Sequence, residues 1–336
     1  MFSYSLKTVY YFRFFYCVAL FTAVYIFYPL PDFELYSSQN QGRELVMESL
    51  DRTAFTKYIF FYTSKLFFGN PWLTNVLFIA ITNYLLFNLN KLYFDYFKKS
   101  KLFWAFLCPS IAIWTSSYSK EMLFMILLIV NVLVLSNEHK GFWKLLTVFV
   151  MIYITSLLRI QFMPVILLMN FLFLVNNSSI RLFTFIFAVI AFIFLPFFLS
   201  PYVGGIMKSV HTYFFYFEGN SNRKWVDWFN EDDFYAAIPL AYYTSLFKFT
   251  LGEIYRSPFV IVFFVEGLFL LSILIKGFSK LRGLNRAYYF YIIFYAFTIN
   301  FPLNIFNPGS AMRYSSIIFV MIFIFAITFN MKKVYK

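Results

Sequence analysis

Four basic residues stand at the predicted outer ends of apolar segments, in a chain where only 13% of the residues are charged. These cations are Lys120, Arg159, Arg256 and Arg313. The planar guanidinium group of arginine binds phosphate oxygens through paired hydrogen bonds and keeps its charge. Helix starts at Ser119 and after Pro308-Gly309 would add backbone N–H donors. Together these groups predict a binding site for a lipid-linked diphosphate, and the alternative interpretation is four separate snorkelling anchors.

Transfer of a group to a sugar hydroxyl also needs a general base, and three residues are candidates for it. Glu121 follows Lys120 in "SSYSKEM", where Ser117 or Ser119 can cap a helix and the helix dipole favours an acid in the first turn. His211 is one of two histidines in the chain, and Asp32 precedes Glu34 in "PDFEL". We interpret that acidic pair as a solvated loop, and we expect neither a metal site nor a cofactor.

Sugar binding would need flat apolar surfaces next to hydrogen-bonding groups. Gln161 lies close to Arg159 in a short predicted turn, and Trp225 and Trp228 lie in an aromatic segment. Aromatic rings of this kind stack on sugars, although the aromatic belts of membrane proteins account for them equally well. Glu266 falls within an apolar run, where an acid is expected to face the helix bundle and pair with a polar neighbour.

The elements that must position these residues are membrane helices. The chain of 336 residues is 61% hydrophobic and 25% aromatic, which exceeds what a soluble domain can hide from water. We predict an all-α polytopic membrane protein with about ten transmembrane helices. The predicted spans are 10–30, 71–92, 102–118, 121–137, 142–158, 162–176, 181–200, 258–276, 287–303 and 314–331.

The distribution of charge predicts the topology. With both termini in the cytoplasm, the cytoplasmic segments hold 16 Lys or Arg residues and two acids, whereas the outer segments hold 12 of each. The basic set begins with Lys7 and Arg13 and ends with Lys332, Lys333 and Lys336. This asymmetry is the positive-inside pattern, so the net charge of +13 indicates orientation in a membrane and not a nucleic-acid partner. We expect one transmembrane domain over 1–336, with short amphipathic helices in outer loops at about 31–70 and 200–257.

Three short islands resemble a known family. The element Pro109-Ser110, Trp114, Lys120-Glu121 is similar to the "PS…W…K-D/E" stretch of the O-antigen polymerase (Wzy) family, and Arg159 and "NPGSAMRY" also look like that group. The resemblance implies a fold similar to the GT-C class of lipid-dependent glycosyltransferases, in the bacterial inner membrane. It implies transfer of a growing glycan from undecaprenyl diphosphate to the next lipid-linked repeat unit at the periplasmic face. A chain-length regulator protein is a possible partner.

The sequence is also compatible with two other functions. A GT-C glycosyltransferase that uses a polyprenyl phosphate-sugar donor would depend on Asp32 and Glu34 more than on Arg159 or Arg313. A flippase or transporter of lipid-linked glycans would show two similar halves and charges along a path through the membrane. The sequence shows no such halves, and the four cations lie on one predicted side.

Overall fold

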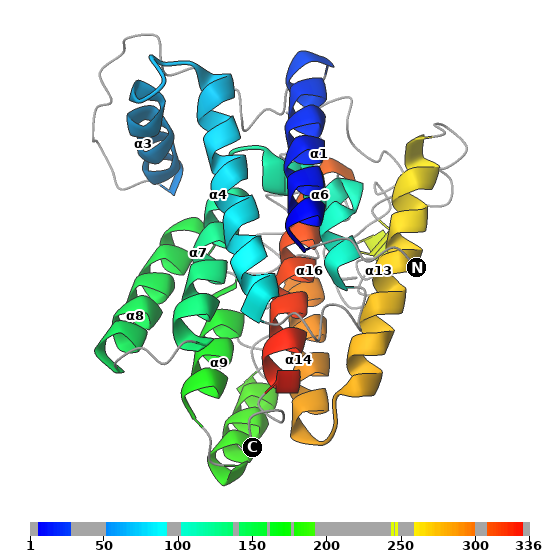
Figure 1. Cartoon of the computed structure of the whole chain (residues 1–336). Coiled ribbons are helices and arrows are strands. Elements are labelled where there is room, and N and C mark those ends of the chain that lie inside the picture. The colour runs from blue at the N-terminus through cyan, green and yellow to red at the C-terminus, as the bar shows by residue number, and fades with distance from the viewer. Residues whose placement is uncertain are drawn as a thin grey trace, which may run out of the picture. The chain divides into compact units, whose positions relative to one another are not determined.

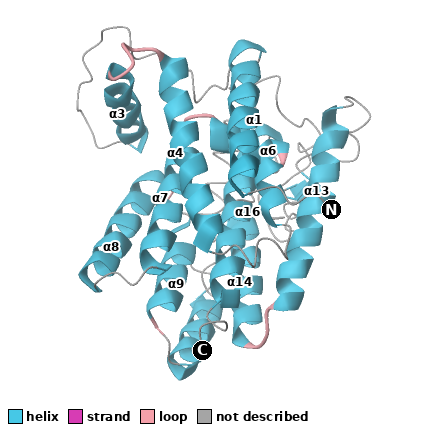
Figure 2. Ribbon diagram, viewed as in Figure 1, coloured by secondary structure: helices cyan, strands magenta, loops and turns pink. Residues whose placement is uncertain are grey.

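The computed structural model describes residues 6–27, 52–92, 102–136, 141–159, 162–175, 178–191, 243–244, 246–247, 259–299 and 308–331. Within these residues every regular element is a helix and none is a strand, as Figure 2 shows. The prediction of an all-α protein is therefore confirmed for the described part of the chain. Helices satisfy their own backbone hydrogen bonds, so an apolar helical chain suits a lipid environment.

The chain divides into two compact units, Met1–Asn170 and Phe171–Lys336, and the division falls inside one helix. The helices of the first unit (Figure 1) are α1 (Leu6–Phe27), α3 (Arg52–Lys65), α4 (Pro71–Leu92), the 3₁₀ helix η2 (Leu102–Leu107), α6 (Pro109–Ser116), α7 (Lys120–Ser136), α8 (Gly141–Leu158) and α9 (Met163–Leu174). In this unit α1 packs on α4 and α6, and α7 packs on α4 and α8.

The helices of the second unit are Ser178–Ala191, α13 (Phe259–Lys280), α14 (Leu284–Ile299) and α16 (Pro308–Met331). Gly283, with φ +55°, makes the turn between α13 and α14, where a side chain would be strained. Gly277 leaves room for the ring of Tyr289, whose hydroxyl donates to the Leu274 carbonyl at 3.2 Å. Small residues and aromatic rings therefore let the helices of this unit pack closely.

Four described helices are long and apolar enough to cross a membrane: Leu6–Phe27, Pro71–Lys91, Gly141–Leu158 and Val260–Ser279. The pair α6 and α7 makes a fifth if it is counted as one bent span. The protein is thus a helical protein with several candidate membrane spans, and the count of ten, the orientation and the GT-C fold stay predictions.

One predicted span has a different structure. The segment 102–118 is not one helix but the short η2 followed by the eight-residue α6. Pro109 occupies the first turn of α6, where proline starts a helix without losing a backbone bond. The chain then leaves the helix at Ser117, so this apolar stretch cannot cross a bilayer by itself. The last predicted span also begins earlier than expected, because Pro308 and Gly309 belong to α16 and not to a separate turn.

Candidate functional site

The candidate site is built at the break between α6 and α7, whose axes are bent by 93°. A broken helix leaves backbone groups without their usual partners, and each must be satisfied inside an apolar protein. Asn75 of α4 supplies both partners. Its Nδ2 donates to the carbonyl of Ser116 at 2.6 Å, and its Oδ1 accepts from the amide of Tyr118 at 2.6 Å. One buried asparagine thus bridges the two sides of the break.

Tyr118 fixes the break to a third helix. Its ring is fully buried and packs against Phe60 of α3 and Phe78 of α4, with centroids 4.6 and 4.5 Å away. Its hydroxyl donates to the carbonyl of Thr56 at 2.6 Å. The bend is therefore held by hydrogen bonds and aromatic packing from α3 and α4, which gives the start of α7 a defined direction.

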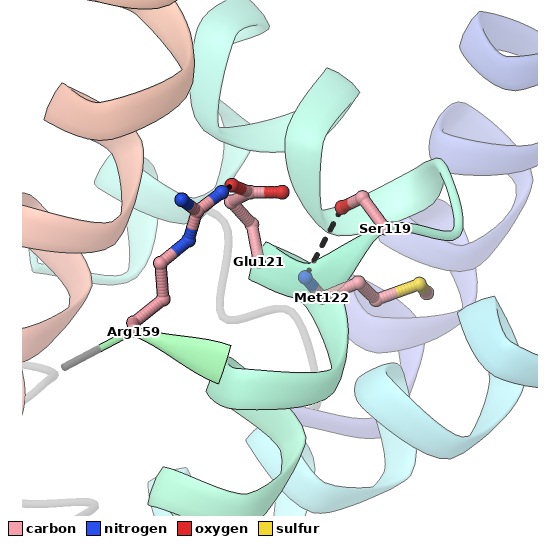
Figure 3. A network of polar contacts seen from close by, with 4 residues as sticks. All are labelled: Ser119, Glu121, Met122 and Arg159. Atoms are coloured by element: carbon pink, nitrogen blue, oxygen red, sulfur yellow. Dashed lines mark hydrogen bonds and ion pairs between the residues drawn. The ribbon is translucent and has the colours of Figure 1, made fainter. Parts of the chain in front are cut away.

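Ser119, one of the two serines that the sequence offers as a cap, begins α7. Its Oγ accepts from the amide of Met122 at 3.3 Å (Figure 3), and its carbonyl accepts from the amide of Leu123 at 3.1 Å. Lys120 and Glu121 then form the first turn of the helix. A carboxylate at this position interacts favourably with the positive end of the helix dipole.

Glu121 forms an ion pair with Arg159, an arrangement that the sequence analysis did not predict. Glu121 lies in the first turn of α7 and Arg159 directly follows α8, and the two side chains point toward one another in Figure 3. Glu121 is 1% exposed and the Arg159 side chain 11%. Arg159 follows the last residue of α8, where the negative end of that helix dipole favours a cation. The pair therefore joins two complementary helix ends in a nearly dry environment.

Arg13 is a second buried cation. It was counted among the cytoplasmic charges, which stays a prediction, and it lies inside α1 with no exposed surface. Its guanidinium donates to Asn83 Oδ1 at 3.1 Å and to Thr115 Oγ1 at 2.9 Å. Charge-assisted bonds of about 1.5–3 kcal/mol each can offset an insertion cost of about 2.5–3.5 kcal/mol. Arg13 thus ties α1 to α4 and to the end of α6, just before the break.

The remaining predicted cations fall elsewhere. Arg313 belongs to the second unit, in the second turn of α16, with its guanidinium 5.7 Å from the centre of the Tyr314 ring. Its part in the same diphosphate site stays a prediction. The predicted residues outside the described part of the chain are Asp32, Gln161, His211, Trp225, Trp228 and Arg256.

Glu266 lies in α13 and is 4% exposed, so the prediction that it faces the interior of the helices is confirmed. The neighbouring Gly267 is closely approached by Leu246 and Phe247. Among the described residues, no group of three or more His, Cys, Asp or Glu side chains could hold a metal ion.

The sequence analysis missed Asn75 and Arg13, the two residues that hold the break from a distance. A weak signal was present in both cases. Asn75 and Arg13 are strongly polar residues within apolar runs, and such residues usually face the protein interior. The partner that each one finds, however, depends on helix packing across more than 40 residues of chain.

Comparison with known proteins gives no relative. No protein-family model, no curated protein and no solved structure matches this chain.

Proposed function

We propose that the protein is a polysaccharide polymerase of the O-antigen polymerase type, which acts on lipid-linked diphosphate substrates at the outer face of the bacterial inner membrane. The observation that carries the proposal is the ion pair of Glu121 with Arg159, beside Lys120 at the start of α7. It gathers an arginine, a lysine and a helix N-terminus in one unit, which are groups suited to a phosphate ligand.

In this proposal the ion pair is present in the substrate-free form of the site. Glu121 holds the guanidinium of Arg159 in a nearly buried position until a diphosphate takes its place. A diphosphate competes well with the Glu121 carboxylate for arginine, because phosphate and carboxylate oxygens bind the planar guanidinium group in the same way. Arg159 and Lys120 then stabilise the charge that grows on the leaving diphosphate.

The proposed reaction transfers the glycan in one displacement. The hydroxyl oxygen of the acceptor sugar forms a bond to the anomeric carbon of the donor, while the bond from that carbon to the diphosphate oxygen breaks. The electron pair of the broken bond leaves with undecaprenyl diphosphate, and the hydroxyl proton passes to a base. Glu121 becomes available for this proton once Arg159 has turned to the diphosphate, and His211 and Asp32 are the other candidates.

One observation favours a second candidate function, a flippase or transporter of lipid-linked glycans. Transporters commonly bind substrates at interrupted helices, and α6 and α7 form such an interrupted pair. The two functions predict different products when the protein is lost.

Deletion of the gene separates the two candidates. The proposal predicts that cells without the protein carry surface lipid with a single repeat unit, visible as one band on a gel, and that the wild-type gene restores the ladder of long chains. Complete absence of surface glycan would support the flippase, and an unchanged ladder would contradict both.

The most informative variant for complementation is Glu121→Gln with Arg159→Gln, because the two changes together keep the net charge and avoid a lone buried ion. The proposal predicts that this double variant makes single repeats only. The control is Lys144→Gln, which removes a basic group at the opposite end of α8. Long chains from the double variant would remove Arg159 from the proposed role.

A further inference from the structure

The turn between α3 and α4, residues Leu66–Asn70, presents an aromatic side chain in an unusual way. Phe68 has φ +52°, and it is the one residue other than glycine with a positive φ in the described part of the chain. This left-handed conformation is costly for a bulky side chain. Backbone strain of this kind persists only where the surrounding structure imposes it.

The surrounding hydrogen bonds do impose this conformation. The amide of Gly69 donates to the carbonyl of Ser64 at 2.9 Å, and the amide of Asn70 donates to the carbonyl of Phe67 at 2.9 Å. Asn70 then caps α4 by accepting from the amide of Leu73 at 3.1 Å. The turn is thus closed at both ends, and α3 itself is attached to the first unit through Tyr118. Phe68 is held outward by a well-defined turn.

The Phe68 side chain gains nothing from the described part of the chain. Its relative exposure is 103%, so no described residue covers the ring. Leu66, two residues earlier, is 72% exposed, and Tyr62 on α3 is 62% exposed. An exposed phenylalanine in a strained conformation is unfavourable for the described part of the chain, so a contact outside that part is needed to offset its cost.

The position of the turn indicates what that partner is. It directly precedes α4, a candidate membrane span that begins at Pro71. Trp72 in the first turn of α4 donates to Thr22 Oγ1 of α1 at 3.1 Å, so the start of one candidate span lies beside the end of another. Tryptophan and tyrosine gather at the level of the lipid headgroups, and the ends of two spans mark that level.

The charge beside the turn fits the same partner. The ammonium group of Lys65 lies 4.6 Å from the centre of the Phe61 ring and 5.1 Å from that of Tyr62. A lysine whose ammonium group lies over aromatic rings at a span end is suited to contact lipid phosphates. A protein partner would need about 800 Å² on each side, far more than Leu66 and Phe68 offer, whereas a bilayer accepts single anchors.

We propose that the Leu66–Asn70 turn is a membrane anchor, which inserts the side chains of Leu66 and Phe68 among lipid acyl chains while Lys65 contacts headgroup phosphates. The anchor fixes α3 at the membrane surface, next to the start of α4. It does not depend on the proposed polymerase function.

The test uses the full-length protein in vesicles of phosphatidylethanolamine and phosphatidylglycerol. A polarity-sensitive dye is attached at Phe68→Cys or, in a separate variant, at Lys91→Cys, an exposed position at the other end of α4. The native Cys17 and Cys108 are buried and are replaced by alanine in both variants. Lipids that carry a nitroxide on the acyl chain should quench the dye at position 68, and a water-soluble quencher should act on position 91.

A second variant separates anchoring from folding. Phe68→Gly removes both the strain and the anchor, so its melting temperature in detergent should rise above that of the wild type. Quenching of position 68 by the water-soluble agent to the same extent as position 91 would overturn the proposal. Protection of position 68 from both quenchers would also overturn it, because the side chain would then be covered by protein. A fall in the melting temperature of Phe68→Gly would show that the side chain serves the fold instead.

Discussion

The α6–α7 break of the first unit and the helices α13 and α14 of the second unit solve the same problem in opposite ways. Both must place apolar helices against one another. At the break, side chains from distant helices satisfy the backbone: Asn75 bridges Ser116 and Tyr118. In α13 and α14 the helices are continuous, and close packing depends on Gly277 beneath the ring of Tyr289.

This difference shows that a ligand-binding site forms more readily at a helix break than within a continuous helix. In a continuous helix the backbone N–H and C=O groups bond to one another, so few of them remain to bind a ligand. An interrupted helix exposes a helix end inside the protein and needs polar side chains around it. Glu121 and Arg159 lie at such an end, and this explains why the charged pair is found in the first unit and at this place.

The largest effect is expected from breaking the ion pair. Glu121→Ala or Arg159→Ala leaves one buried charge without its partner, and the free energy of unfolding should fall by about 3–5 kcal/mol. The Glu121→Gln, Arg159→Gln double variant should recover most of this loss. Reversible unfolding of the purified protein in mixed micelles measures all three, and additive losses in the double variant would contradict the pairing.

A comparable effect is expected at Asn75. Asn75→Ala leaves the carbonyl of Ser116 and the amide of Tyr118 without their partner, at about 1–3 kcal/mol for each buried group. The same unfolding measurement tests this loss. The control is Asn88→Ala, on the same helix, because the Asn88 amide bonds only the nearby carbonyl of Tyr84. Equal effects of the two substitutions would show that the break does not depend on Asn75.

In the second unit, a substitution that adds a side-chain atom tests close packing between helices. Gly277→Ala would place a Cβ 2.5 Å from the Tyr289 hydroxyl oxygen, and overpacking of this kind should cost about 1–3 kcal/mol. Tyr289→Phe removes that oxygen, so the Gly277→Ala, Tyr289→Phe double variant should be more stable than Gly277→Ala alone. Lack of rescue in a double-mutant cycle would contradict packing through this contact.

The smallest effect is expected at the helix cap. Ser119→Ala removes the acceptor for the amide of Met122 and should cost about 1 kcal/mol. Ser119→Asp should restore the loss because aspartate also caps helices. Unfolding of both variants in micelles measures the difference. A Ser119→Ala protein as stable as the wild type would show that the cap bond does not stabilise α7.

Hydropathy was sufficient to place most of the helices. The predicted spans 71–92 and 142–158 agree with α4 and α8 within one residue. In lipid, a long apolar run between polar segments can form few structures other than a helix. The segment 102–118 was misassigned because composition does not show where a helix stops. The stop at Ser117 depends on Asn75, which lies more than 40 residues earlier in the chain.

The candidate site was predicted only in part. The types of Lys120, Glu121 and Arg159 indicated a charged site, and Ser119, which caps α7, was one of the two serines predicted as caps. The ion pair and the burial of Arg13 were not foreseen, because charge counting treats each basic residue near a helix end as solvated. Tertiary packing determines the partner of each buried charge. No local pattern in a single sequence shows that partner.

The central claim is that Arg159 binds the diphosphate of a lipid carrier. Its most direct test is a titration of undecaprenyl diphosphate into the purified protein in nanodiscs, with binding followed by calorimetry. We expect saturable binding by the wild type and by Lys144→Gln, and loss of binding in the folded Glu121→Gln, Arg159→Gln double variant. Equal binding by the double variant and the wild type would contradict it.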